Sequence, residues 1–369
     1  MSILDFTSSS YLGLRHPSWT LKPWSRLTTG VPAALAEPGS ARAAAAGLAS
    51  LAGAERAVLA TSTLHAFFDL FVTLGPADLS CYVDAGAYPV AVWGAERAAG
   101  QGALIHRFPH RDVAALGRML RDHATAGRRP VVVADGVCPG CGLLAPVRGC
   151  LRVLRPYGGL LVLDDTQAMG LLGAAAGTFP PYGRGGGGTL RMAGLAPPGL
   201  LTVSSLAKAF GVPVAFLAGA AGLIDRYEER SETRVHCSPP SLAHISAARH
   251  ALGVNAMLGD TLRDRLAELV GRLQRGVRDL GYRVGPTAFP VQAVAPVDGV
   301  PPADLYHRLL DLGVRGVLYR PACRPAATCG FLVTAGHTPE QIDYLVAALG
   351  WAITGLAPRA PSRRLPTRC

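Results

Sequence analysis

Seven short apolar runs recur through the first 220 positions, and most are continuous rather than alternating. They occupy residues 57–62, 79–84, 103–108, 130–137, 159–165, 200–205 and 214–219. Strands that are apolar on both faces are typical of parallel sheets, in which both faces of the sheet are covered. Longer amphipathic segments such as RDVAALGRMLRDHATAG separate several of these runs. The alternation predicts a three-layer α/β domain with a mostly parallel central sheet.

The spacing of apolar residues changes after about residue 225. Long segments with apolar residues three and four positions apart indicate helices, and a smaller α/β region with a terminal helix follows them. Residues 182–199 are rich in glycine and proline, which predicts a loop. We therefore divide the chain into an N-terminal segment, a large domain, a small C-terminal α/β domain and a basic disordered tail, at residues 1–45, 46–255, 256–357 and 358–369.

Composition narrows the class of protein. Hydrophobic residues make up 49% of the 369 positions, enough for a sizeable core, and the formal net charge is +11. Its arginines are scattered, so we expect no nucleic-acid partner. No charged segment followed by an apolar one opens the chain, and the longest uncharged apolar run, VPVAFLAGAAGLI, is too short for a bilayer. The sequence thus predicts a cytoplasmic protein without a membrane partner.

Eight cysteines are present, and in a cytoplasmic protein we expect them to be reduced thiols. Cys138 and Cys141 form a CxxC in the segment GVCPGCG. No second CxxC follows at the spacing of a zinc ribbon, so we predict no metal site. A redox or metal role for this pair is the less favoured alternative.

Lysine is nearly absent from the chain, with only Lys22 and Lys208 among 36 basic residues. Lys208 follows a predicted buried strand, where desolvation lowers the pKa of an ammonium group and makes the neutral amine accessible. A neutral amine attacks carbonyl groups, so a Schiff base with a substrate or with pyridoxal phosphate is its natural role. The alternative is an ordinary surface lysine. Retention of this lysine in an arginine-biased chain favours the chemical role.

Three further features surround this lysine in the predicted fold. Asp164 and Asp165 end an apolar strand, where a carboxylate can keep a pyridine nitrogen protonated, although one of them can instead cap the next turn. Small hydroxyl residues in LATSTLHAFF precede a helix whose free N–H groups suit a phosphate, although such residues cap many helices. Tyr88 follows another strand and can stack on a flat cofactor, or be an ordinary tyrosine. Together they indicate pyridoxal phosphate.

In their order and spacing, these motifs resemble the α-oxoamine synthase family of fold-type I pyridoxal-phosphate enzymes. LDFTSSSYLGLRHP is similar to the family's N-terminal motif, and LVLDDTQAMGLLG is similar to its D-D-A-H-G-x-G segment. VVADGVCPGCGLLAPV, VSSLAKAFGV, VHCSPPSLA and TAGHTPEQID continue the likeness over nearly the whole chain. The resemblance implies an aspartate-aminotransferase-like fold, a homodimer with active sites at the interface, and bound pyridoxal phosphate.

The resemblance also implies roles for individual residues. Lys208 corresponds to the internal-aldimine lysine that later moves the Cα proton, and Asp164 to the partner of the pyridine nitrogen. Gln167 stands where the family has the histidine that hydrogen-bonds the cofactor's phenolic oxygen; a glutamine can donate there but cannot shuttle a proton. The remaining cofactor-binding positions are the phosphate contacts Thr63, Leu64, Ser205 and His236, the last donated by the neighbouring subunit, and the stacking residue Tyr88.

Other departures fall at the substrate side. Ser9 replaces the asparagine of the N-terminal motif beside Tyr11, and Pro139 replaces a serine. The family's carboxylate-binding arginine is missing, because its region reads Thr328, Cys329 and Gly330. An arginine fork contributes strongly to carboxylate recognition. Its loss suggests a different substrate or a substitute, and the candidate substrate-binding residues are Ser9, Tyr11, Arg320 and Arg324.

Three functions remain open from the sequence. The leading hypothesis is a divergent α-oxoamine synthase-like transferase in secondary metabolism, which condenses an amino acid with an acyl thioester of coenzyme A or of a carrier protein and releases CO2. The second keeps the cofactor but runs another reaction, as an aminotransferase, an aldolase-type lyase or a decarboxylase. The third is a non-catalytic binding protein. Retention of Lys208 and Asp164 disfavours the third.

Overall fold

The computed structural model describes residues 3–123, 127–195 and 198–355, so the predicted tail at 358–369 lies outside the described residues. Its seven-stranded sheet has the strand order β2-β8-β7-β6-β5-β3-β4. β8 is antiparallel to both neighbours, and the other pairs are parallel. The strands are β2 (Arg56–Ala60), β3 (Leu79–Asp84), β4 (Leu104–Phe108), β5 (Arg129–Asp135), β6 (Leu160–Asp164), β7 (Leu200–Ser205) and β8 (Ala215–Gly219). The predicted sheet is confirmed.

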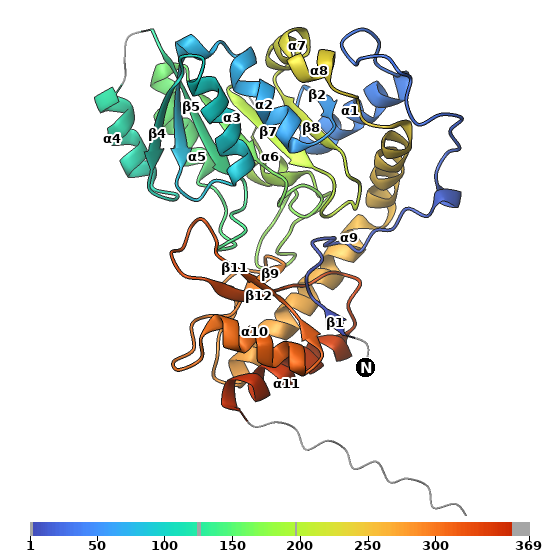
Figure 1. Cartoon of the computed structure of the whole chain (residues 1–369), viewed down its shortest axis with the longest axis vertical. Coiled ribbons are helices and arrows are strands. Elements are labelled where there is room, and N and C mark those ends of the chain that lie inside the picture. The colour runs from blue at the N-terminus through green and yellow to red at the C-terminus, as the bar shows by residue number, and fades with distance from the viewer. Residues whose placement is uncertain (1–2, 124–126, 196–197, 356–369) are drawn as a thin grey trace, which may run out of the picture.

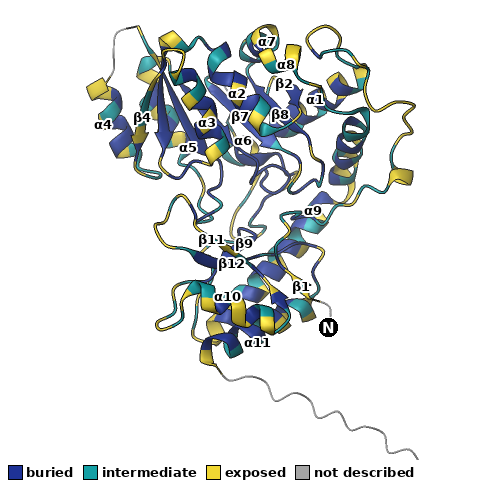
Figure 2. Ribbon diagram, viewed as in Figure 1, coloured by how far each residue is buried: buried dark blue, intermediate teal, exposed yellow. Residues whose placement is uncertain are grey.

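Side chains of the central strands are apolar on both faces because helices cover both faces (Figures 1 and 2). In β5, Val131 and Val133 pack into one core cluster, while Val132 and Ala134 pack into another on the opposite face. The first cluster includes residues of α2 (Thr63–Thr73), α3 (Pro89–Ala99) and α7 (Ala221–Arg230). The second includes residues of α4 (Val113–His123), α5 (Val147–Leu154) and α6 (Gly188–Ala193).

A helix of 38 residues, α9 (Leu242–Asp279), connects the large sheet to the C-terminal part of the chain. Ile245 and Ala248 pack with α1 (Gly39–Ala52) and β8, whereas Leu266 and Leu273 belong to the C-terminal core. Figure 1 shows α9 running from one part of the molecule into the other. The predicted boundaries of the four parts stay a prediction.

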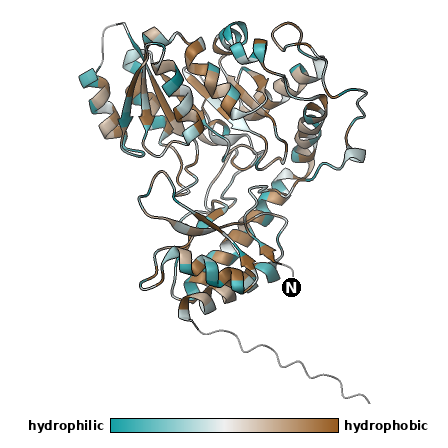
Figure 3. Ribbon diagram, viewed as in Figure 1, coloured by the Kyte–Doolittle hydropathy of each residue, from teal (hydrophilic) through white to brown (hydrophobic). Residues whose placement is uncertain are grey.

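The C-terminal part has a small antiparallel sheet with the order β11-β12-β9. Figure 3 shows apolar strands and helix faces gathered here as they are in the large sheet. A short parallel pair, β1 with β10, ties the N-terminus to this part. The elements are β1 (Leu4–Asp5), β9 (Val291–Ala293), α10 (Pro302–Asp311), β10 (Val314–Arg315), β11 (Val317–Tyr319), β12 (Thr328–Leu332) and α11 (Pro339–Thr354).

Residues 182–199 are not entirely a loop, because α6 lies within them. Asp165 explains why a helix forms in so glycine-rich a segment: its carboxylate accepts hydrogen bonds from the backbone N–H of Thr189, at 2.9 Å, and from the Thr189 hydroxyl. A Cβ at Gly188 would lie 2.2 Å from the same carboxylate, and Gly188 has a φ of +84°.

The remaining short elements are the 3-10 turns Ser18–Thr20, Pro76–Asp78 and Arg155–Tyr157 and the helix α8 (Glu232–His236).

Close packing of α2 on α3 gives a test of the fold. A Cβ added at Gly94 of α3 would lie 2.3 Å from the carbonyl oxygen of Phe67 in α2. We expect Gly94→Ala to lower the free energy of unfolding by about 2 kcal/mol because the backbones must separate. Gly222→Ala in α7 is the control, since nothing lies within 4 Å of its added Cβ. Thermal melting compares the two, and equal melting temperatures would contradict this packing.

Candidate cofactor-binding site

Acidic residues end three neighbouring strands at the carboxyl edge of the large sheet. Asp84 ends β3, Asp135 ends β5 and Asp164 ends β6. All three are buried, and Asp135 and Asp164 are partners in the register of the parallel ladder. Ligands of open α/β sheets bind at this edge. The structure therefore gathers three buried carboxyl groups where the predicted site lies.

Asp164 is held in place by the turn that follows β6. Its Oδ1 accepts a hydrogen bond from the backbone N–H of Thr166 at 3.0 Å. Burial raises the pKa of Asp164 above its ordinary value, and the hydrogen bonds from Thr166 and the charge of Lys208 oppose that rise. Asp165 points the other way and binds Thr189. The two aspartates therefore make different interactions: Asp165 binds Thr189, whereas the charge of Lys208 acts on Asp164.

Lys208 lies in the turn after β7, half-buried. Burial lowers the pKa of its ammonium, while the charges of Asp164 and Asp135 raise it. The net direction is downward, so burial outweighs the two carboxylates and the neutral amine becomes more accessible. This is the electrostatic state that nucleophilic attack on a carbonyl requires.

Asp135 is a site residue that the sequence reasoning missed. Its Oδ1 accepts the backbone N–H of Tyr88 at 2.9 Å, while its Oδ2 is buried without a hydrogen-bond partner among the described residues. Burial, followed by the charge of Asp164, raises the pKa of Asp135 well above its ordinary value. Its position at the end of a strand, like that of Asp164, was the available signal. An unpaired buried carboxylate oxygen of this kind is a candidate for contact with a bound molecule.

The N-terminus of α2 lies at the candidate phosphate position. Ser62 caps the helix, since its hydroxyl accepts the backbone N–H of His65 at 3.4 Å and bonds the His65 ring at 2.8 Å. Thr63 and Leu64 are the first two residues of the helix, and first-turn N–H groups have no intrahelical acceptor. These two donors can therefore bind an anion, as predicted from the sequence.

Ser205 ends β7 and is connected to the turn after β6. Its backbone N–H donates to the Thr166 hydroxyl at 3.1 Å, and its own hydroxyl accepts the N–H of Ala207 at 3.2 Å. Tyr88 precedes α3 and is about half exposed, with its backbone held by Asp135. His236 ends α8 with an exposed side chain. The cofactor roles of these residues stay predictions.

Gln167 makes a contact that the sequence did not predict. Tyr11, fully buried, donates its hydroxyl to the Gln167 Oε1 at 2.6 Å. The amide oxygen is thereby occupied, and the amide NH2 is the group left to donate. Tyr11 was predicted to bind substrate; the structure shows its hydroxyl bonded to Gln167, and the substrate role stays a prediction. Ser9 lies two residues earlier, and its carbonyl accepts the Tyr11 N–H at 2.8 Å.

The segment Thr328–Gly330, where the family's motif has a carboxylate-binding arginine, is buried in the small sheet. Thr328 and Cys329 are buried residues of β12, and Tyr319 of β11 is the register partner of Thr328. Arg320 directly follows Tyr319 and is exposed. Arg324 lines a separate cavity of about 190 Å³ between β9, β12 and α10, which none of Lys208, Asp164 and Gln167 lines. The substrate-binding roles of the two arginines stay predictions.

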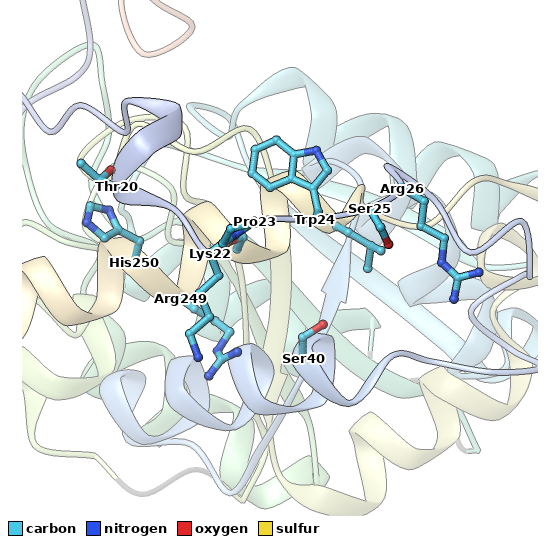
Figure 4. A pocket seen from close by; sticks show the side chains of 11 residues that line it. Thr20, Lys22, Pro23, Trp24, Ser25, Arg26, Ser40, Arg249 and His250 are labelled. Carbon is cyan, nitrogen blue, oxygen red and sulfur yellow. The ribbon is translucent and has the colours of Figure 1, made fainter.

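A cavity of about 660 Å³ is lined by residues 20 and 22–26 of the N-terminal segment together with residues of α1 and α9 (Figure 4). Lys22, the chain's other lysine, lines it together with Trp24, Arg249 and His250. None of the predicted cofactor residues lines this cavity. Volume alone therefore does not identify the site; the buried charges at the sheet edge do.

Comparison with known proteins places this geometry in a family. Residues 3–349 match the family described as aminotransferase class I and II. The chain is 34% identical to an 8-amino-7-oxononanoate synthase of Alkalilimnicola ehrlichii over 252 residues, which cover 68% of this chain and 61% of that protein. A synthase of the same name from Marinobacter nauticus is 33% identical and covers 67% and 60%. The matched region thus spans about three fifths of these relatives.

Solved structures show the same fold. Serine palmitoyltransferase from S. paucimobilis, solved with a PLP–myriocin adduct, superposes with a TM-score of 0.83 at 20% identity and covers 96% of this chain and 88% of that one. An 8-amino-7-oxononanoate synthase from Francisella tularensis gives a TM-score of 0.74 at 17% identity, with 96% and 98% covered. The predicted fold, and the resemblance to α-oxoamine synthases, are confirmed.

No helix among the described residues is long and apolar enough to cross a membrane. The family model covers nearly all of the described chain, and PLP is the group bound in the S. paucimobilis structure. Because the family model matches residues 3–349, nearly the whole described chain, this chain belongs to the class I and II aminotransferase family.

Proposed function

We propose that the chain is a pyridoxal-phosphate-dependent transferase that condenses an amino acid with an acyl thioester, as an α-oxoamine synthase does. The observation that carries the proposal is the pairing of a half-buried lysine with two buried carboxylates at the carboxyl edge of the sheet. Similarity to the 8-amino-7-oxononanoate synthases supports the reaction class.

The residues present fit this cofactor. Lys208 can bind its carbonyl carbon, and the N–H groups of Thr63 and Leu64 can bind its phosphate. Asp164 can hold a proton at the pyridine nitrogen, and the cofactor's cation would in turn remove the cost of ionising that buried carboxyl. The unpaired Oδ2 of Asp135 supports contact with a further polar group at this edge of the sheet.

Bound pyridoxal phosphate supplies an electron sink for negative charge at the substrate Cα. The protein's own groups do the remaining work. Lys208 would take and return the Cα proton, since its lowered pKa suits a general base. Gln167 would offer its amide N–H to the cofactor's phenolic oxygen, because Tyr11 already occupies its amide oxygen. A glutamine orients and stabilises here without exchanging a proton.

The substrate side supports a specificity different from that of the relatives. β12 carries Thr328, Cys329 and Gly330 in place of a carboxylate-binding arginine, and Thr328 and Cys329 are buried in the small sheet. Both predicted substitutes are exposed: Arg320 directly follows the register partner of Thr328, and the charge of Arg324 acts on that same Tyr319. We infer a specialised biosynthetic role in which the amino acid or its mode of binding has changed. The same change favours, as the second candidate, a cofactor-dependent reaction without a thioester.

A homodimer is part of the proposal. Exposed apolar side chains occur together on α2 and α3, where Arg97 stacks on the Phe68 ring at 3.9 Å and Leu64 and Trp93 are also exposed. An exposed apolar patch beside a binding site is typical of a subunit interface. Sedimentation of the purified chain tests this: a dimer mass supports it, and a monomer at micromolar concentration contradicts it.

The reaction class is tested by free-thiol release. Purified protein with cofactor, an amino-acid panel and acyl thioesters of coenzyme A or carrier protein should release thiol and CO2. Lys208→Ala should lower the rate by at least about 10³-fold, because both cofactor attachment and proton transfer lose their group. Lys22→Ala is the matched control and should keep the rate. Cofactor binding without thiol release across the panel would favour the second candidate instead.

The Tyr11–Gln167 contact gives a separate prediction. Tyr11→Phe should leave the cofactor bound but lower kcat about five- to tenfold, the equivalent of about 1 kcal/mol for one lost neutral hydrogen bond. The pH titration of the bound cofactor's visible band should shift as well, since Gln167 loses its fixed orientation. Tyr182→Phe is the control: Tyr182 is equally buried but donates to the Ala288 carbonyl. Identical titrations in both variants would contradict the positioning role.

A further inference from the structure

Four side chains that can ligate a metal gather beside the candidate cofactor site. They are His110, Cys138, Cys141 and Cys323, and their ligating atoms all lie within 4.8 Å of one another. His110 and Asp84 act electrostatically on Asp135, so this cluster adjoins the acidic edge described above. Nothing in the proposed condensation uses these four residues.

The CxxC segment folds as a tight turn that presents its sulfurs. The N–H of Cys138 donates to the Leu143 carbonyl at 3.0 Å, and the N–H of Gly142 donates to the Cys138 carbonyl at 2.8 Å. Gly142 adopts a φ of +69°, which favours glycine. The thiolate is the form in which cysteine binds a metal.

His110 is oriented toward these sulfurs by a carboxylate. Its Nδ1 bonds the Asp84 Oδ1 at 2.6 Å, and its Nε2 lies 3.5 Å from the Cys141 Sγ. Asp84 is itself fixed, since it accepts the backbone N–H groups of Gly86 at 2.7 Å and Arg111 at 2.9 Å. A carboxylate behind a histidine in this way fixes the ring and its tautomer in metal sites.

Cys323 comes from a different part of the chain, in the segment between β11 and β12. The two segments are in close contact, because a Cβ at Gly140 would lie 2.6 Å from the Cys323 Sγ and 2.4 Å from the Cβ of Pro321. Glycine at position 140 is therefore required for Cys323 to reach the pair. The sequence reasoning expected no metal because it looked for a second CxxC, whereas the structure brings the other two ligands from distant segments.

We propose that His110, Cys138, Cys141 and Cys323 bind one Zn²⁺ ion in a closed tetrahedral site. Zn–S bonds of about 2.3 Å place tetrahedral ligand atoms about 3.8 Å apart, so the cluster needs to contract by no more than about 1 Å. Three soft thiolates and one imidazole suit Zn²⁺ better than Mg²⁺ or Ca²⁺. Binding oxidises nothing: the three thiols and the imidazole Nε2 give up any protons they carry to solvent, and Nδ1–H stays with Asp84.

Four protein ligands leave no open position, so the ion is structural rather than catalytic. It joins the segment after β5, which follows Asp135, to the segment after β11, which carries Arg320 and Arg324. The ion therefore clamps the small sheet onto the cofactor edge at the side where the substrate's carboxylate must be recognised. A disulfide within the CxxC would instead leave His110 and Cys323 directed at a group they cannot ligate.

Metal analysis tests the site directly. Protein purified without chelator and freed of any affinity tag should contain about one zinc per chain, and Cys141→Ser, Cys323→Ser and His110→Ala should each reduce the content at least about tenfold. Cys237→Ser is the matched control, since this cysteine is outside the cluster and equally half-buried. Circular dichroism shows whether each variant is folded. Full zinc content in both Cys141→Ser and Cys323→Ser would overturn the assignment.

Cobalt substitution of the wild-type chain keeps the test independent of variant folding. Metal-free protein titrated with Co²⁺ should saturate at one ion per chain, with intense tetrahedral ligand-field bands and sulfur-to-metal charge transfer. Zn²⁺ should then displace it. A wild-type protein that holds no zinc, gives no tetrahedral cobalt spectrum, or shows a Cys138–Cys141 disulfide by mass spectrometry when purified under reducing conditions would refute the proposal. Because no readout depends on activity, this outcome is separable from the proposed enzyme reaction.

Discussion

Two buried carboxyl groups and a half-buried lysine lie at the carboxyl edge of the large sheet, and the candidate site depends on the balance between burial and the attraction of their charges. Asp135 and Asp164 are partners in the parallel ladder, and burial raises the pKa of both. Lys208 brings a positive charge to them, yet burial also lowers its own pKa. Leaving any one of these groups charged and alone would be costly in a dry interior. The edge is therefore poised for a bound molecule that carries both a carbonyl and a basic nitrogen.

The secondary structure of the large sheet followed directly from the sequence because its strands are apolar on both faces. Val131 to Val133 show why: neighbouring side chains enter different cores, so no polar alternation interrupts the run. The helix α6 escaped prediction because its nucleus is a tertiary contact, the hydrogen bonds from Thr189 to Asp165. Local propensity could not show it in a glycine-rich segment.

The candidate site residues also fall into two groups, those that the local sequence indicates and those that only the fold brings together. Lys208 and Asp164 could be proposed as candidates from composition and strand position without any tertiary information, and their roles stay predictions. Asp135 had the same signal as Asp164 and was overlooked. The contact between Tyr11 and Gln167 joins residues 156 positions apart, so no local sequence pattern predicts it. The Cys–His cluster likewise takes its ligands from separate segments, so only the fold shows that they meet.

The departures from the family's motifs lie around the proposed cofactor position rather than at Lys208, the residue expected to bind the cofactor. Gln167 is held by Tyr11, the strand β12 lacks an arginine, and a cysteine-rich turn packs against the segment that follows Tyr319. Tyr319 itself has a buried hydroxyl without a hydrogen-bond partner among the described residues, and burial raises its pKa to about 12. An unpaired phenol at this place is a further group that a substrate can satisfy. The half-buried lysine and these contacts support the proposal that the substrate-binding side differs from that of the relatives.

The central claim is that Lys208 is the residue that binds pyridoxal phosphate covalently. Because the chain contains only two lysines, borohydride reduction of the cofactor-loaded protein followed by peptide mass spectrometry decides it. The account predicts one phosphopyridoxyl group per chain, located on the peptide that contains Lys208. A phosphopyridoxyl group on Lys22, or none on either lysine in a folded and cofactor-saturated protein, would contradict it.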